Sequence, residues 1–150
     1  MSLPLFWFRE DMEWTKKYIC PLLKRFGNAV ENDLLRAMLA VQRGLQEELY
    51  GQDVASVEDD CLTVAYVRDM VTAATSELYE LLDETSWKPV SFFADSFSLD
   101  REGVRRELVD VWMFLMNIMI ATRMTADDLF VGFMRKQAEV RIRHGLSNSH

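Results

Sequence analysis

The chain has 150 residues, of which 49% are hydrophobic and 27% charged, and these proportions predict one globular domain with a sizeable core. Its formal net charge of −7 argues against a protein that follows nucleic-acid phosphates, so we expect no nucleic-acid partner. The sequence has no apolar run of the length, about eighteen residues, that spans a bilayer. The apolar stretch Leu3–Phe8 is short and is followed at once by charged residues, unlike a signal peptide. We therefore expect a cytoplasmic protein without a membrane partner.

Glycine and proline are scarce, and no stretch of useful length alternates as a strand does. This pattern predicts an all-α fold, a bundle of four to five helices. We expect a single domain over residues 1–150, with its core at about 29–145 and a disordered tail at 146–150. Cys20 and Cys61 are isolated from one another, and we expect both to be buried thiols.

The first third of the chain contains two predicted helical regions and a connector. Pro4–Phe26 favours one or two short helices broken at Pro21. Ala29–Tyr50 ends before Gly51 and has an apolar stripe with helical spacing, formed by Leu34, Leu35, Met38, Leu39, Val41, Leu45 and Leu49. Gln52–Glu58 is predicted to be a polar connector.

A long helix is predicted from Asp59 or Asp60, either of which can cap it, to about Glu84. Its apolar stripe consists of Leu62, Val64, Val67, Met70, Val71, Ala74, Leu78 and Leu81. After an aromatic loop at Thr85–Leu99, a second long helix is predicted over Asp100–Arg123. A final helix follows, opened by a sequence that resembles a capping box, Thr125-Ala126-Asp127-Asp128.

The two long helices each carry an acidic pair with i,i+3 spacing: Glu77 with Glu80, and Glu107 with Asp110. The carboxylates of each pair leave the same face of their helix, so two neighbouring antiparallel helices would bring all four together. Such a group repels itself strongly unless cations lie within it, and oxygen ligands suit Mg²⁺ or Mn²⁺. Acidic pairs are also common on solvated helix faces. The second helix, however, is apolar nearly all round from Leu108, which predicts burial and favours a metal site.

The acidic pattern resembles that of the all-α nucleoside triphosphate pyrophosphatase superfamily, which includes the MazG-like enzymes and the dimeric dUTPases. The family pattern is two adjacent glutamates, two other residues, a third glutamate, a variable loop and then ExxD. Glu77 and Glu80 match the second and third glutamates, and Glu107 and Asp110 match ExxD. Ser76 stands in place of the first glutamate.

This resemblance extends over roughly residues 60–145 and implies a bundle of the all-α pyrophosphatase type. It implies hydrolysis of a nucleoside triphosphate to the monophosphate and pyrophosphate, with Mg²⁺ or Mn²⁺ as cofactor. The residues that match the family's catalytic residues and metal ligands are Glu77, Glu80, Glu107 and Asp110. It also implies a nucleotide substrate and a homodimer or homotetramer. A non-catalytic helical dimer scaffold with the same fold stays open as an alternative.

Five further residues match substrate contacts of the resembled family. Trp87 and Lys88 match its Trp-Lys turn, and Asn117 matches a contact to the sugar or base. Lys136 and Arg143 match basic residues of the family's C-terminal helix.

That C-terminal helix departs from the dUTPase-like pattern at three places. Val140 stands where an asparagine is usual, His144 where a glutamine is usual, and Leu146 where a tyrosine is usual. Because a valine cannot pair with the hydrogen-bonding edge of uracil, we expect dGTP or another non-uracil deoxynucleotide as substrate. A dUTP-specific diphosphatase is the alternative.

Overall fold

The computed structural model describes residues 33–85 and 98–145 and is all-helical over these ranges, which confirms the predicted fold class. Its elements are α3 (Leu34–Tyr50), the short 3₁₀-helix η3 (Val54–Ser56), α4 (Asp60–Asp83), α5 (Arg101–Ala121) and α6 (Ala126–Arg143). Within the described ranges, extended pairing is limited to an isolated antiparallel bridge between Thr85 and Leu99. The helices predicted in Pro4–Phe26, the loop around Trp87 and Lys88, and the tail at 146–150 lie outside the described residues.

Short polar side chains set the starts of α4, α5 and α6. The Asp59 carboxylate accepts hydrogen bonds from the first free backbone N–H groups of α4, and Asp100 does the same for α5. Thr125 and Asp128 form a reciprocal capping box at the start of α6. The predicted helix starts are therefore confirmed, since each follows from a capping residue that the sequence displays.

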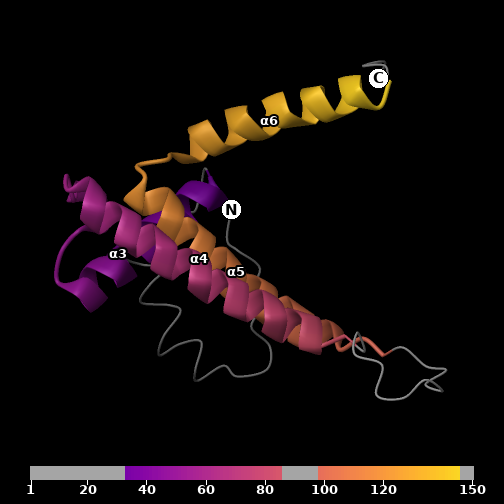
Figure 1. Cartoon of the computed structure of the whole chain (residues 1–150), viewed down its shortest axis with the longest axis horizontal. Helices are drawn as coiled ribbons and strands as arrows, with labels where there is room; N and C mark the ends of the chain where they lie inside the picture. Colours follow the sequence, from indigo (N-terminus) through magenta and orange to yellow (C-terminus); the bar gives the residue numbers. More distant parts are fainter. Residues whose placement is uncertain (1–32, 86–97, 146–150) are drawn as a thin grey trace. The chain divides into compact units, whose positions relative to one another are not determined.

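Two compact units divide the chain: Met1–Val41 with Met124–His150, and Gln42–Arg123. In the second unit α4 and α5 lie side by side as an antiparallel hairpin (Figure 1). The hairpin is closed near its loop by a 3.0 Å hydrogen bond from the Asp100 N–H to the Glu84 carbonyl. In the first unit, an ion pair of 2.5 Å joins Arg36 of α3 to Asp127 of α6.

The core of the second unit lies between η3 and the two helices of the hairpin. It consists of Val54, Met70, Ala74, Val111, Met116, Met119, Ile120 and Ala121. Val54 belongs to η3, where the sequence predicted a polar connector. Asp53 caps that turn by accepting from the Ala55 N–H, and Val54 can then be buried. The connector Gln52–Glu58 therefore contains a 3₁₀ turn, Val54–Ser56, that packs through Val54.

The face of α3 that is buried differs from the predicted apolar stripe. Ala37, Gln42 and Gln46 are the buried residues of this helix, whereas Leu34 and Leu49 are 60% and 67% exposed. The two glutamines form hydrogen bonds with side chains of the hairpin, so burying them leaves no amide without a partner. The apolar stripe of α3 is therefore partly exposed in the single chain, and the helix is buried mainly through Ala37 and the two glutamines.

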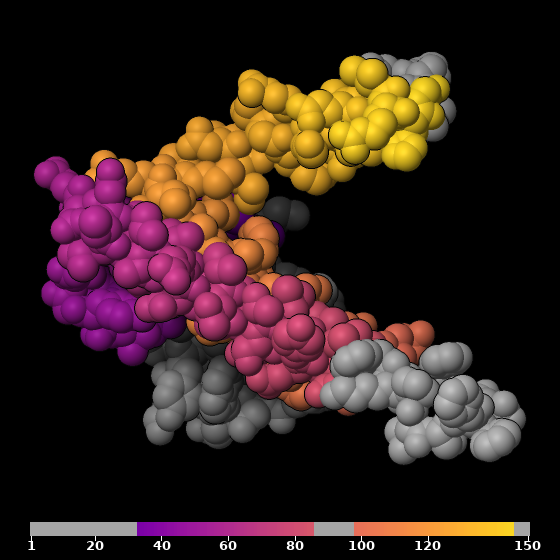
Figure 2. Space-filling model, viewed as in Figure 1, coloured from indigo at the N-terminus to yellow at the C-terminus, as the bar shows by residue number. Residues whose placement is uncertain are grey.

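The outer faces of the hairpin carry apolar side chains that the single chain leaves exposed. On α4, Leu62, Val64, Val71 and Leu78 are exposed. On α5, Leu108 and Val109 are 54% and 58% exposed, so the expectation that this helix is buried all round was wrong for the single chain. Cys61 is a free thiol but is exposed rather than buried, because it lies on the outer side of the first turn of α4. Figure 2 shows part of the outer surface of α4, in magenta to rose.

Taken singly, no helix of the described ranges is long and apolar enough to cross a membrane. The helices α5 and α6 reach that length and composition only as a pair with a bend between them.

Candidate metal centre

Three of the four predicted acidic residues meet between the helices of the hairpin. Glu77 of α4 and Glu107 and Asp110 of α5 each offer a carboxylate oxygen, and these oxygens lie within 4.8 Å of one another. Glu107 is 7% exposed, and the other two are half-buried. Because the helices are antiparallel, the i,i+3 face of α5 turns toward the second half of α4, as the spacing predicted.

Glu80 lies one turn beyond Glu77 and is exposed, and it does not belong to this group of three. Its charge nevertheless acts on the group, since it contributes to the raised pKa of Glu77. Loss of hydration raises the pKa of the Glu77 carboxyl most, followed by the negative charges of Glu80, Asp110 and Glu107. The four predicted carboxylates therefore form one electrostatic cluster, with three of them close enough to share a cation.

Arg106 is the base that neutralises this cluster in part. Its Nε donates to Oε1 of Glu107 over 2.9 Å, and its Nη2 donates to Oε1 of Glu84 over 3.4 Å. The proximity of Glu107, by hydrogen bond and by charge, raises the pKa of the Arg106 guanidinium. No other basic residue of the described ranges pairs with the group, so among these residues its net charge is negative.

Arg106 and Gly103 also shape the site, and neither was among the residues predicted from the sequence. Arg106 immediately precedes the ExxD pattern, and that position was a visible signal. Gly103 lies one turn earlier on α5, and a Cβ there would come within 2.4 Å of the Glu84 carboxyl carbon. The glycine therefore provides the space in which the Glu84 side chain lies.

A second polar cluster joins α3 to the hairpin. Gln42 donates from Nε2 to Oδ1 of Asn117 over 2.7 Å, and Asn117 donates from Nδ2 to the sulfur of Met70 over 3.3 Å. Tyr66 donates its hydroxyl hydrogen to Oε1 of Gln46 over 2.6 Å, and burial raises the pKa of this tyrosine to about 12. Asn117, predicted as a substrate contact, thus has a protein partner in this structure.

Of the other predicted substrate contacts, two fall outside the described residues and two belong to the first unit. Trp87 and Lys88 fall outside the described residues. Lys136 and Arg143 are exposed on α6, in the first unit, and Lys136 forms an ion pair of 2.9 Å with Glu139. Val140 is half-buried on the same helix.

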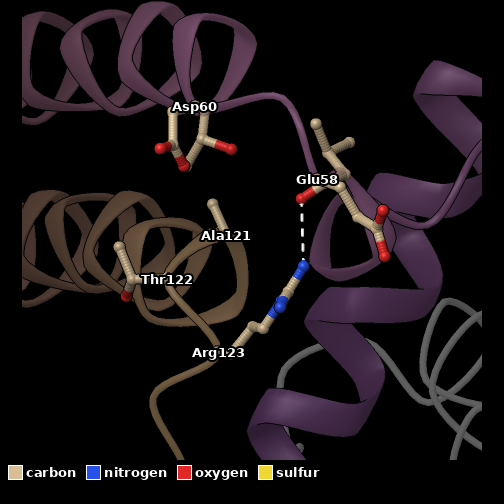
Figure 3. Close-up of a pocket in the computed structure, with 7 residues that line it drawn as sticks. Glu58, Asp60, Ala121, Thr122 and Arg123 are labelled. Carbon is tan, nitrogen blue, oxygen red and sulfur yellow. Dashed lines mark hydrogen bonds between the residues drawn. The ribbon is translucent and has the colours of Figure 1, made fainter.

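Two cavities lie at the opposite end of the hairpin from the acidic group, roughly 25 Å away along α4 at 1.5 Å per residue. The larger, of about 440 Å³, is lined by Val57, Glu58, Asp60, Thr63, Ala121, Thr122 and Arg123 (Figure 3). Arg123, whose φ of 57° ends α5, donates to the carbonyls of Ala55 and Val57 over 3.0 and 3.2 Å. Its guanidinium therefore fixes the turn before α4. The cavity lies where this turn meets the end of α5.

The smaller cavity, of about 160 Å³, is apolar and borders Tyr50 and Tyr66. The two rings meet edge to face with their centres 5.7 Å apart. Neither cavity gathers carboxylates from both helices as the group at Glu77 does, so that group is the better candidate for a catalytic site.

Residues 34–145 match the family model described as dUTPase. The match covers most of the chain and begins at α3, so the relationship extends further toward the N-terminus than the acidic pattern indicated. No curated protein and no solved structure matches the chain. The family match supports nucleotide hydrolysis as the general kind of activity. The all-helical fold and the acidic pairs on α4 and α5 agree with this match, and the chain belongs to the dUTPase family.

Proposed function

We propose that the protein is a metal-dependent diphosphohydrolase that converts a deoxynucleoside triphosphate and water to the monophosphate and pyrophosphate. The observation that carries this proposal is the meeting of Glu77, Glu107 and Asp110 within 4.8 Å between two antiparallel helices. A fold gains no stability from three such charges unless a cation compensates them, so their convergence favours a role in binding.

The donor set fits Mg²⁺ or Mn²⁺. All three groups are carboxylates, the hard oxygen ligands that these ions prefer, and no nitrogen or sulfur ligand belongs to the group within the described ranges. Glu77, Glu107 and Asp110 would hold the ion, and Glu80 adds negative charge from the next turn. When bound, the ion would supply positive charge for the phosphate oxygens and would make nearby water more acidic.

Protein side chains would accept the proton of the attacking water and contact the nucleotide. Water attacks phosphorus and pyrophosphate leaves, and the proton of the attacking water passes to a cluster carboxylate that is not engaged with the ion. We expect Lys88, Lys136 and Arg143 to contact phosphate oxygens and Trp87 to contact the nucleotide, as the family resemblance implies.

We propose further that the protein does not prefer uracil as the base. Uracil recognition needs polar groups that pair with the ring edge, and Val140 has none to offer. Gln42 and Asn117 are buried and hydrogen-bonded to one another at 2.7 Å, so each would have to exchange that partner to serve a base. We therefore expect dGTP or another non-uracil deoxynucleotide to be accepted, with Asn117 close to the sugar or base.

The test is a turnover screen of the full chain with dATP, dCTP, dGTP, dTTP and dUTP in Mg²⁺ or Mn²⁺, resolving the monophosphate and pyrophosphate. We expect both products in equal amounts and no turnover in EDTA. Release of inorganic phosphate would contradict the reaction. A kcat/KM for dUTP about a thousandfold above every other substrate would establish the dUTP-specific alternative instead. Absence of turnover with every substrate would favour the helical scaffold.

We also propose that the protein works as a homodimer or homotetramer. The exposed apolar residues of α3, α4 and α5 include Leu34, Leu49, Leu62, Val64, Leu108 and Val109, and this much apolar surface on three helices favours burial against another subunit. Light scattering at micromolar concentration should give at least twice the 17.5 kDa mass of the chain. A mass of one chain would contradict the proposal.

A further inference from the structure

Arg106 connects two carboxylates at the edge of the acidic group. Its Nε lies 2.9 Å from Oε1 of Glu107, and its Nη2 lies 3.4 Å from Oε1 of Glu84. A guanidinium is planar and its N–H directions are fixed, so two carboxylates bound at once determine its orientation. Arg106 is 62% exposed at its side chain, whereas Glu107 is buried, so the arginine reaches inward from the surface to a carboxylate that solvent barely touches.

Glu84 is itself fixed in place. It is the residue at which α4 ends, and its carbonyl accepts from the Asp100 N–H over 3.0 Å, which ties it to the start of α5. Its carboxylate occupies the space left by Gly103, where a Cβ would approach its Oε2 within 2.4 Å. Gly103 thus leaves room for Glu84, Glu84 binds Arg106, and Arg106 in turn positions the Glu107 carboxylate.

The contact with Arg106 restricts how Glu107 can bind a cation. Because Oε1 accepts from the guanidinium, one of its lone pairs is engaged, and Glu107 would hold a cation chiefly through its other oxygen. Mg²⁺ requires near-ideal octahedral geometry, in which ligands bound through a single oxygen fit well. Ca²⁺ accepts six to eight oxygens and readily binds carboxylates through both oxygens.

We propose that Arg106 is a positioning residue that holds Glu107 as a one-oxygen ligand and thereby makes the acidic group select Mg²⁺ over Ca²⁺. Glu84 anchors Arg106, and Gly103 provides the room for Glu84. This inference rests on the proposed function, since it takes Glu77, Glu107 and Asp110 as the cation site.

The experiment measures metal binding by the full chain without nucleotide. Mn²⁺ is titrated and followed by electron paramagnetic resonance, and Mg²⁺ or Ca²⁺ is then added as competitor. In Arg106→Gln and Arg106→Lys we expect the affinity for Mg²⁺ to fall by about tenfold relative to that for Ca²⁺, the lower end for loss of a residue that orients a ligand. The lysine variant keeps the positive charge but not the fork of two donors, so it separates positioning from charge.

Arg105→Gln is the matched control. It removes the same charge from the neighbouring position of α5, and Arg105 pairs with Glu102 rather than with the acidic group. We expect this variant to change the affinities for both ions by the same factor. Glu84→Met is the second route to the same effect, since it leaves Arg106 in place but removes the oxygen that anchors it. We expect the ratio to shift in the same direction.

Equal changes in Mg²⁺ and Ca²⁺ affinity in the two Arg106 variants would overturn the inference. Asp110→Asn distinguishes this failure from that of the proposed function. If the native chain binds Mg²⁺ and Asp110→Asn does not, the site stands and the role of Arg106 alone is wrong. If the native chain binds neither Mn²⁺ nor Mg²⁺, both proposals are wrong.

Discussion

The hairpin of α4 and α5 carries two polar clusters, and the fold satisfies one while leaving the other with excess charge. In the amide cluster, Gln42 pairs with Asn117 over 2.7 Å and Tyr66 pairs with Gln46 over 2.6 Å. No buried side-chain nitrogen or oxygen of the described residues lacks a hydrogen-bond partner. These neutral groups can be buried at little cost because each replaces a bond to water with a bond to protein.

The carboxylate cluster follows the opposite pattern. Glu77, Glu107 and Asp110 approach within 4.8 Å, and Arg106 compensates part of their charge through Glu107. Lost hydration and repulsion are unfavourable for the fold, and both raise the pKa of Glu77. Buried polar groups that have protein partners therefore indicate a structural role, whereas uncompensated charge indicates a site for a ligand.

Loss of activity should be the largest effect in the carboxylate cluster. Asp110→Asn removes one negative ligand without changing the size of the side chain, and we expect turnover to fall by more than about a hundredfold, beyond the range seen when supporting residues are changed. Pyrophosphate release at saturating Mn²⁺ measures this loss. Glu80→Gln removes the negative charge that lies next to the group, and it should also abolish turnover. Near-native activity of both variants would show that the cluster is no metal site.

Metal binding should stabilise the fold through the same cluster. At a free Mg²⁺ concentration a hundred times its dissociation constant, the free energy of unfolding should rise by about 2.7 kcal/mol, because the ion binds the folded state alone. Urea unfolding with Mg²⁺ and with EDTA measures the difference. Asp110→Asn should show little of this gain, and an equal gain in that variant would place the ion elsewhere.

In the amide cluster, single substitutions should lower stability and the paired substitution should recover part of it. Asn117→Leu leaves Nε2 of Gln42 buried without a partner, which should lower the free energy of unfolding by about 1–3 kcal/mol. Gln42→Met with Asn117→Leu replaces both partners by apolar groups, so its loss should be smaller than the sum of the two single losses. Urea unfolding in EDTA gives all three values, and strict additivity would contradict the pairing.

The smallest expected effect is the pH dependence of Glu77 in the metal-free protein. Its pKa is higher in the folded than in the unfolded state, so the folded state binds the proton more tightly. Its charged form therefore lowers stability above the raised pKa, and this penalty disappears as the pH falls below the ordinary value of 4.5. Glu77→Gln should be more stable than the native chain at pH 7 in EDTA, and the two should converge near pH 4. Greater stability of the native chain at pH 7 would contradict the sign.

The sequence by itself determined the helices and the pairing of acidic faces. Capping residues such as Asp59, Asp100 and Thr125 act within one turn of chain, so local sequence predicts where α4, α5 and α6 begin. The i,i+3 spacing of Glu107 and Asp110 likewise sets a common face, because helix geometry is the same in every context.

Only the tertiary structure decided which helix faces are buried and which charges meet. The apolar stripe of α3 did not show that Gln42 and Gln46 lie inside, where their partners are on α4 and α5. The spacing could not show that Glu80 stays apart from the three closest carboxylates, or that Arg106 reaches Glu84 across the end of the hairpin. These arrangements depend on how the packed helices are rotated against one another, and no local pattern specifies that rotation.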